Sequence, residues 1–401
     1  MTGKAGPRPL EGIRVLEMGQ LLAGPFAGCV LGYFGAEVIK VEPPGGDPIR
    51  GWRVVRDGTS LWWASLARNK KSVTLDLQSA RGRELAKALA AKSDVLIENF
   101  RPGTMEKWGL GPAELKALRP ELIYARVSGY GQTGPYASRP GFASVCEGFA
   151  GFRHLNGFPD RAPVRPNLSM GDTLAGLHAV IGILLALTAR LRQKAPAGQV
   201  VDVAIYESVF NMLESVVPEY DGAGVVREPS GSTITGIVPT NTYRCADGKY
   251  VIIGGNGDSI YQRLMRAIGR AEMAKDARYA TNAKRVENEQ DIDDAISAWT
   301  GARDSTAVLE ALRAAEVPNG PIYSVADMMT DEHFIARGMF ETVSVGGKPL
   351  KIPAIPPLLG DTPGRTDAPG PALGAHTDEV LGGVLGLSAG ACAELRAAKV
   401  I

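Results

Sequence analysis

The 401-residue sequence has almost no net charge and no secretory leader pattern, and each shortage excludes a class of function. Its 44 Lys and Arg residues are balanced by 43 Asp and Glu residues, which leaves a formal charge of +1. A protein built mainly to bind nucleic acid or an anionic membrane would carry a basic field, so we expect neither partner. The first residues lack the apolar core of a signal peptide, which favours a cytoplasmic protein.

Cysteine and histidine are also scarce, with four of each. Cys29, Cys146, Cys245 and Cys392 lie far apart, and no C-x-x-C pair or nearby histidine accompanies them. We therefore expect reduced, mostly buried thiols, without a disulfide framework and without a metal site. The histidines form no cluster and none comes with a G-x-S-x-G serine, so a hydrolase triad gains no support.

The usual nucleotide-binding motifs are missing as well. No G-x-x-x-x-G-K-[ST] occurs, and the loop after the first expected strand reads GQLLAGPFAG instead of G-x-G-x-x-G. An NAD enzyme or a P-loop NTPase is therefore disfavoured. Gly and Pro, in contrast, number 49 and 27 and make up about 19% of the chain, above an average of about 12%. Together with 45% hydrophobic residues, this composition indicates a globular enzyme with many turns.

The first half of the chain alternates strand-like apolar runs with helical patterns. Strands are expected at 13–18, 37–42, 72–77, 94–97 and 121–128, with helices that include 21–35 and 79–92. Ser79 is the expected N-cap of the second of these helices. Such alternation predicts a parallel sheet covered on both faces, with a ligand at the carboxyl ends of its strands.

The most apolar stretch runs from 173 to 191 and contains His178 and two glycines. It is short for a membrane crossing, and we interpret it as a buried helix of a water-soluble protein. A further strand and helix follow at 199–205 and 206–220.

The second half is organised differently. A polar stretch at 221–242 is the candidate boundary, and a strand at 249–254, a helix from Asp258 and helices within 287–315 indicate a smaller α+β domain. The Pro- and Gly-rich segment 346–374 fits an extended connection over a surface, before a helical tail from Thr377. The predicted parts are a large α/β domain, a small α+β domain, and a linker with a returning tail. Their ranges are 1–225, 226–335 and 336–401.

Two short turns at the expected ligand edge carry cations. Asn69-Lys70-Lys71 precedes a strand, and the segment 98–103, which includes Phe100 and Arg101, follows another. Fixed cations, backbone N–H groups and an aromatic face suit a phosphorylated, nucleotide-like ligand, although short basic turns are also common without any ligand.

Asp172 stands at the start of the long apolar helix, in the sequence SMGDT. Helix capping alone would explain an Asp there. However, Gly171 permits close approach by a ligand, and a carboxylate at the start of a buried helix is costly unless it has a purpose. A carboxylate in a partly dry site is a competent nucleophile toward an activated acyl group. Gly254-Gly255-Asn256-Gly257 is either a mobile loop that approaches a ligand or a loose turn.

Taken in order, seven segments resemble the class III CoA-transferases, the family of formyl-CoA and carnitine CoA-transferases. They are PLEGIRVLEMGQLLAGP, GAEVIKVEPPGGD, NKKSVTLDL, SDVLIENFRPGTMEKWGL, SGYGQTGPY, MGDTLAGLHAVIGILLAL and GQVVDVAIYESVFN. Each alone is weak, but all of them in this order form a specific signal over nearly the whole chain.

The resemblance implies a Rossmann-like large domain, a smaller domain, and two chains interlocked as a dimer. It implies that Asp172 is the nucleophile and that Gly254, Gly255, Asn256 and Gly257 shield the intermediate from water. CoA is then a substrate, with no tightly bound cofactor and no metal. The implied CoA contacts are Leu22, Ala23, Lys70, Lys71, Asn99, Phe100, Arg101 and Lys107.

One segment departs from the family pattern. Many members carry Tyr-Asp where this chain has Phe142-Ala143, so contacts from that point are in question. Related α-methylacyl-CoA racemases need a histidine roughly where Phe142 stands, and its absence weighs against a racemase. The expected activity is CoA transfer from an acyl-CoA, with succinyl-CoA as a plausible donor, to a free carboxylic acid. A racemase or a catalytically silent CoA-binding subunit is the alternative. Arg153, Arg161 and Arg165 follow as candidates for binding a dicarboxylate, or as solvated loop residues.

Overall fold

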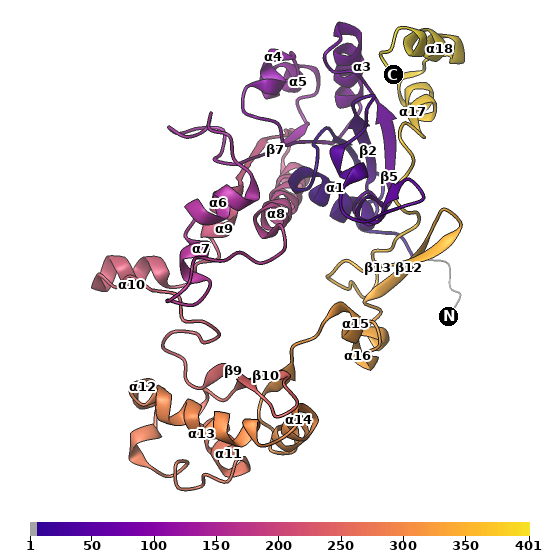
Figure 1. Ribbon diagram of the computed structural model, residues 1–401. Helices are drawn as coiled ribbons and strands as arrows, with labels where there is room; N and C mark the ends of the chain where they lie inside the picture. The colour runs from indigo at the N-terminus through magenta and orange to yellow at the C-terminus, as the bar shows by residue number, and fades with distance from the viewer. Residues whose placement is uncertain (1–5) are drawn as a thin grey trace. The chain divides into compact units, whose positions relative to one another are not determined.

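The computed structural model describes residues 6–401, which cluster into two compact units (Figure 1). The first unit contains 6–152, 166–214 and 333–401, and the second contains 153–165 and 215–332. The predicted large domain ran without a break to residue 225, whereas 153–165 and 215–225 belong to the second unit. Residues 1–5 of that predicted domain lie outside the described residues.

The first unit is built on a six-stranded parallel sheet, and all six strands were predicted. Their order is β5-β2-β1-β6-β7-β8, which in chain order is 3-2-1-4-5-6, the order of dinucleotide-binding sheets. The predicted α/β fold with a Rossmann-like sheet is therefore confirmed. The strands are β1 (Arg14–Glu17), β2 (Glu37–Glu42), β5 (Lys70–Thr74), β6 (Val95–Glu98), β7 (Ile123–Ser128) and β8 (Val200–Ala204).

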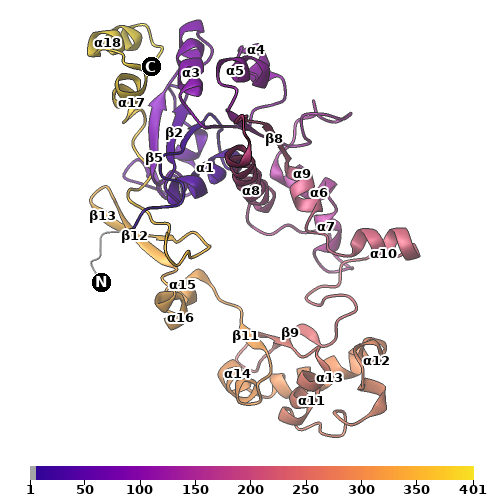
Figure 2. The ribbon, with the colours of Figure 1, turned by 180° about the vertical axis from the view of Figure 1, so that it is seen from behind.

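Helices cover both faces of this sheet (Figures 1 and 2). Adjacent residues of a strand point to opposite faces, so Val15 packs with α1 (Ala23–Tyr33) and α8 (Met170–Arg192), while Leu16 packs on the other side. That other side carries α3 (Ala80–Ala91), whose predicted N-cap is confirmed because Ser79 Oγ accepts the Gly82 N–H at 2.9 Å. The same layer contains α5 (Pro112–Leu118), α17 (Thr377–Leu385) and α18 (Ala389–Ala397).

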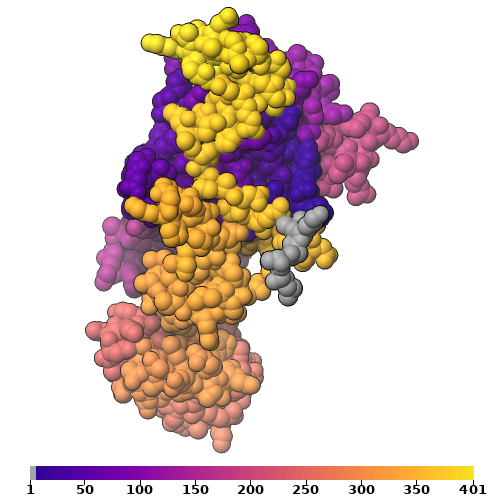
Figure 3. Space-filling model, turned by 90° about the vertical axis from the view of Figure 1, so that its right-hand side faces the viewer, coloured from indigo at the N-terminus to yellow at the C-terminus, as the bar shows by residue number. Residues whose placement is uncertain are grey.

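The C-terminal tail returns to this unit, and Figure 3 shows it lying against the N-terminal part of the chain. Trp63 Nε1 donates to the Pro371 carbonyl at 2.9 Å, and the Thr74 N–H donates to Thr377 Oγ1 at 3.1 Å. The extended connection predicted at 346–374 is present from residue 354 onward. Its first part, 346–353, instead forms the turn and the second strand of a hairpin between β12 (Phe340–Val345) and β13 (Lys348–Pro353).

Helix α8 is long and apolar enough to cross a membrane by length and composition, as core helices of soluble proteins also can be. Its inner face packs on α1 and the sheet, where Gly176 lies so close to α1 that a Cβ would come within 2.9 Å of the Ala23 carbonyl oxygen. Its outer face exposes Leu177, Ile181 and Leu185. The helix predicted to be buried is therefore buried on one face and exposed on the other.

The predicted helix 206–220 is interrupted. It consists of α9 (Ile205–Phe210) and α10 (Val216–Ala223), and Glu214 between them adopts a positive φ of 49° that no helix allows. Other short elements of the first unit include β3 (Val55–Arg56), β4 (Thr59–Ser60), α2 (Leu61–Leu66), α4 (Thr104–Lys107) and α6 (Ala143–Phe149).

The second unit has its own core around a three-stranded antiparallel sheet in the order β11-β10-β9. Its main elements are β9 (Thr240–Arg244), β10 (Tyr250–Gly254), α11 (Asp258–Ala267), α12 (Asn282–Glu287), α13 (Glu289–Gly301), α14 (Ser305–Ala314) and β11 (Asn319–Pro321). Gly257 is the N-cap of α11, and Asp258 is the first residue of that helix.

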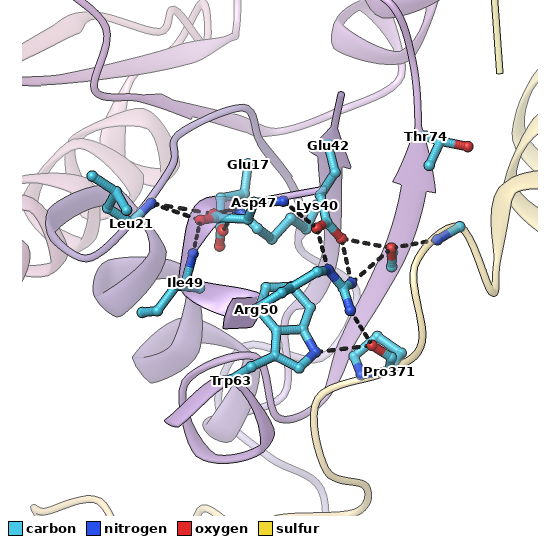
Figure 4. A network of polar contacts seen from close by, with 12 residues as sticks. Glu17, Leu21, Lys40, Glu42, Asp47, Ile49, Arg50, Trp63, Thr74 and Pro371 are labelled. Carbon is cyan, nitrogen blue, oxygen red and sulfur yellow. Dashed lines mark hydrogen bonds and ion pairs between the residues drawn. The ribbon is translucent and has the colours of Figure 1, made fainter. Parts of the chain in front are cut away.

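A buried ion pair joins the end of β2 to the loop that follows it (Figure 4). The Glu42 carboxylate is fully buried and accepts hydrogen bonds from Arg50 Nε at 2.7 Å and Ser72 Oγ at 2.6 Å. Burial alone would raise the pKa of Glu42, but these bonds outweigh it and hold the pKa below its ordinary value. Arg50 also stacks on Trp63, with its guanidinium carbon 3.7 Å from the ring centroid.

We predict that Leu381→Ala lowers the free energy of unfolding of the first unit by about 2–5 kcal/mol, because it leaves a cavity in the core. Leu381 lies in α17 and is fully buried, although it is remote in sequence from the sheet. Leu358→Ala is the matched control, since that side chain is 71% exposed and its loss should change stability by less than about 0.5 kcal/mol. Urea unfolding measures both, and equal effects would show that the tail is not part of this core.

We predict that Glu42→Gln destabilises the protein near neutral pH and that its difference from wild type shrinks in acid. A carboxylate whose folded pKa is depressed contributes stability above its unfolded pKa, and that contribution is lost as pH falls through the folded pKa. The loss should therefore begin near the ordinary value of 4.5 and continue below it. Urea midpoints of both proteins from pH 7 to pH 3 test this, and a constant difference would contradict it.

Candidate active site

A cavity of about 320 Å³ opens at the carboxyl ends of β1, β6 and β7, where the strand order of the sheet reverses. In such sheets the loops after the two central strands leave toward opposite faces, and the crevice between them is the usual ligand site. The lining residues come from both loops, the end of β7 and the start of α8. They are Gln20–Ala23, Asn99–Pro102, Val127–Gly129, Arg139–Phe142, Asp172 and Ile205.

Six of the predicted site residues meet in this cavity, although they are spread over 150 positions of sequence. They are Leu22, Ala23, Asn99, Phe100, Arg101 and Asp172. Sequence reasoning missed Gln20, Leu21 and Arg139. For Gln20 and Leu21, their position in the loop after a strand was the one available signal, and nothing in the local pattern marks Arg139. Phe142, the departure from the family pattern, is 70% exposed and lies in the same lining.

Asp172 is the third residue of α8, and Ser169 is the N-cap, so the capping interpretation of Asp172 is wrong. The first turn is fixed from its surroundings, because Glu147 is fully buried and its Oε1 accepts the Gly171 N–H at 3.1 Å. Gly171 is closely packed, since a Cβ there would lie 3.0 Å from Cγ2 of Ile205 and would push that side chain aside. The N–H groups and dipole of the helix start favour an ionised carboxylate at Asp172.

Cys146 is the nearby thiol, and the structure keeps it unreactive. Burial first, and then the negative charges of Asp172 and Glu147, raise its pKa to about 11. Its Sγ donates to the Gly129 carbonyl at 3.3 Å. A neutral thiol is a poor nucleophile, so Asp172 is the better candidate in this cavity. All four cysteines are free and buried, as predicted.

The three predicted lysines do not line this cavity. Lys70 is 4% exposed, and its Nζ lies 2.7 Å from Glu17 Oε2 inside the protein. Burial lowers its pKa, against the opposing charge of Glu17. Lys71 pairs with Glu37 and Glu379, each at 2.8 Å, and Lys107 is an exposed residue at the end of α4. Their contacts with CoA stay predictions.

The glycine loop belongs to the second unit and is held in place. The Gly254 N–H donates to the Pro318 carbonyl at 3.0 Å and the Gly255 N–H donates to the Pro239 carbonyl at 2.8 Å. The Asn256 carbonyl accepts from the buried Arg285 at 2.6 Å, so hydrogen bonds hold Gly254, Gly255 and Asn256 of this glycine loop. Its shielding role stays a prediction. Arg153, Arg161 and Arg165 also belong to the second unit, whereas Asp172 belongs to the first.

A larger cavity of about 710 Å³ lies on another side of the α8 start and shares Leu22 with the first cavity. Its lining is mostly apolar and includes Trp62, Met170 and the segment 353–356. Two arginines reach it. The Arg68 guanidinium is bonded to the carbonyls of Ser65 and Pro353, whereas Arg53 stacks over Trp62 at 5.3 Å and pairs with no carboxylate of residues 6–401. Within that range, no group of three or more His, Cys, Asp or Glu side chains could hold a metal ion.

Known proteins match this chain along nearly its whole length. It is 47% identical over 406 residues to succinyl-CoA–D-citramalate CoA-transferase of Chloroflexus aurantiacus, with full coverage of both chains. It is 45% identical over 398 residues to the alpha subunit of succinyl-CoA–L-malate CoA-transferase of Chloroflexus aurantiacus, covering 98% of this chain and 92% of the relative.

A solved CAIB/BAIF family protein from Brucella suis superposes with a TM-score of 0.82 at 35% identity, over 94% of this chain and 100% of the other. The model of CoA-transferase family III matches residues 10–377, the span that contains both cavities. Because the family model matches nearly the whole chain and the relatives are this similar, the chain belongs to CoA-transferase family III, the class III CoA-transferases.

Proposed function

We propose that the protein transfers CoA from succinyl-CoA to a free dicarboxylic acid, with Asp172 as the covalent nucleophile. The carrying observation is that this carboxylate, at the N-terminus of α8, shares one cavity with the loops after β1 and β6. The relatives named above, which act on citramalate and malate, support a dicarboxylate substrate.

The reaction needs no net proton transfer and no redox partner. Asp172 attacks the thioester carbonyl, the C–S bond breaks, and CoA leaves as a thiolate beside a mixed anhydride. The thiolate attacks the aspartyl carbonyl of that anhydride, which releases succinate and forms an aspartyl-CoA thioester. The acceptor carboxylate then attacks this thioester and displaces CoA again. The thiolate finally attacks the acceptor carbonyl, which forms the new acyl-CoA and restores Asp172.

The two cavities supply separate sites for the two ends of the thioester. CoA lies along the cavity of Asp172, where Arg101 and Arg139 offer cations to its phosphates. The acyl group enters the apolar cavity beyond Leu22, which borders the first turn of α8 at Met170. Gly254–Gly257 shields the anhydride from water in this proposal, because the intermediate would otherwise hydrolyse.

Arg53 recognises the second carboxylate of the dicarboxylic acid. It is the cation of the apolar cavity that pairs with no carboxylate of residues 6–401, and Trp62 supports its guanidinium from one side. A planar guanidinium binds a carboxylate through two parallel hydrogen bonds, which also fixes the direction of the substrate.

A homodimer is part of this proposal. The exposed apolar face of α8, with Leu177, Ile181, Leu184 and Leu185, supports the burial of that helix by a second chain. A racemase is not supported, since the cavity lining formed by residues 6–401 contains Phe142 and no histidine.

We predict that Asp172→Ala lowers CoA transfer by about 10⁴-fold or more, because it removes the nucleophile. Mass spectrometry of a matrix of acyl-CoA donors and free acids measures the transfer. Hydroxylamine treatment of the wild-type enzyme mixed with succinyl-CoA should modify the peptide that contains Asp172. The control is Asp378→Asn, which changes an exposed Asp in the first turn of α17. Absence of any adduct, with activity retained in Asp172→Ala, would contradict the proposal.

We predict that Arg53→Gln raises the KM for L-malate by about tenfold or more, because it removes a charge-assisted pair of hydrogen bonds. A monocarboxylic acceptor such as propionate has no second carboxylate, so its kcat/KM should change by less than about threefold. Arg56→Gln is the matched control, because Arg56 is close in sequence but does not line the cavity. An equal loss for malate and propionate would show that Arg53 has no part in selecting dicarboxylates.

A further inference from the structure

Four charged side chains are buried together beside the loop 19–22; Figure 4 shows Glu17, Lys40 and Asp47 among them. They are Glu17, Lys40, Asp47 and Lys70, with exposed fractions of 0, 1, 2 and 4%. Lys40 Nζ lies 3.1 Å from Glu17 Oε1 and 2.9 Å from Asp47 Oδ2, and Lys70 pairs with the other oxygen of Glu17. Two positive and two negative charges therefore balance inside the protein.

This cluster bonds to the loop at two points. Lys40 Nζ donates to the Gly19 carbonyl at 2.7 Å, and the Leu21 N–H donates to the two carboxylate oxygens of Asp47 at 3.1 and 3.2 Å. Between these points, the Asn99 side chain accepts the Gln20 N–H at 2.7 Å and donates to the Gln20 carbonyl at 2.8 Å. The polar backbone groups of the loop are thus satisfied by side chains from β2, from the loop after β2 and from the loop after β6.

The loop conformation requires such support. Leu21 has φ of 63°, in the left-handed region that a residue with a Cβ enters only at a cost. The residues that follow it, Leu22 and Ala23, form a wall of the cavity of Asp172; Leu22 also lines the apolar cavity, and Ala23 begins α1. If Leu21 adopted an ordinary negative φ, this wall would move toward or away from Asp172.

Stability alone explains this cluster poorly. Buried ion pairs often contribute no more stability than apolar side chains of similar size, because desolvation offsets their attraction. They can, however, specify one backbone conformation through directed hydrogen bonds. The attraction of Glu17 and Asp47 outweighs the effect of burial and raises the pKa of Lys40, so the ammonium stays charged. Helix α1 also leaves space for the cluster, since a Cβ on Gly28 would overlap Glu17 Oε2.

We propose that Lys40 and Asp47 are positioning residues that hold Leu21 in its left-handed conformation and so place the wall formed by Leu22 and Ala23 for CoA binding beside Asp172. This inference rests on the proposed function for the identity of the ligand. Neither residue lines either cavity, so both act through the loop.

Asp47→Ala removes the acceptor of the Leu21 N–H, and we expect it to weaken binding of CoA by about tenfold or more. Asp47→Asn keeps an oxygen in the position of Oδ1, which accepts from Leu21 and Ile49, but replaces Oδ2, the partner of Lys40, by an amide NH2 group, so it should recover only part of the lost affinity. If Asp47→Ala fails to fold, Lys40→Met combined with Asp47→Asn keeps the cluster neutral. That double variant still frees the Gly19 carbonyl, and it should also weaken CoA binding.

Asp94→Asn is the matched control. Asp94 also accepts a backbone N–H, that of Arg14 at 3.0 Å, and pairs with Arg119 at 2.9 Å, but it lies at the amino end of the sheet. Its replacement should lower stability without changing CoA affinity by more than about twofold.

Hydrogen exchange of the full-length protein without substrate, and calorimetric titration with CoA, provide the two readouts. Asp47→Ala should speed exchange of the Leu21 amide by about tenfold or more while β7 stays protected, and Asp94→Asn should not. Unchanged exchange at Leu21, or unchanged CoA affinity in a folded Asp47→Ala protein, would overturn the inference. If wild type does not bind CoA at all, the proposed function fails, whereas the exchange experiment still decides whether the cluster holds the loop.

Discussion

The reversal of strand order between β1 and β6 is the constraint on which this site depends. Two adjacent parallel strands whose connections leave toward opposite faces must separate their loops, which opens a crevice between them. The chain fills it with Asp172, which arrives on α8 from more than 70 residues beyond β6. The strand order therefore decides where the crevice lies, and the sequence of α8 decides which side chain enters it.

The same sheet end contains several buried charges. Glu17, Lys40 and Glu42 are buried strand residues, and the buried Asp47 lies in the loop after β2, where the half-buried Arg50 follows it. In an all-parallel sheet both faces are covered, so a charged residue near a strand end has little access to water and must find partners from neighbouring loops. Those partners are the backbone groups of Gly19 and Leu21, in the loop that lines the cavity. The contacts that satisfy these buried charges are therefore also the contacts that hold the loop 19–22.

Much of this fold could be predicted from the sequence, because its signals are local. The six strands are short apolar runs between turn residues, and their alternation with helices is enough to assign the loops after β1 and β6 to the ligand edge. The direction of a side chain, in contrast, could not be predicted from local signals. Lys70 belongs to a basic turn that suits a phosphate, yet its strand register turns it inward to Glu17, and no local pattern records that register. The break at Glu214 and the exposed face of α8 likewise depend on tertiary contacts.

A division between two cavities also suits the energetics of thioester exchange. Donor and product are both acyl-CoA thioesters, so the reaction has little driving force, and selectivity must come from binding and not from chemistry. CoA is common to both half-reactions and can use one rigid surface throughout, which a loop fixed by buried charges supplies. The acyl groups change from one half-reaction to the other, and they need a space that admits more than one acid of similar shape. An apolar cavity with Arg53, whose guanidinium pairs with no carboxylate in the described part of the chain, meets that need. In the proposed function, Arg53 binds the remote carboxylate, and the carbon chain between that carboxylate and Asp172 can vary.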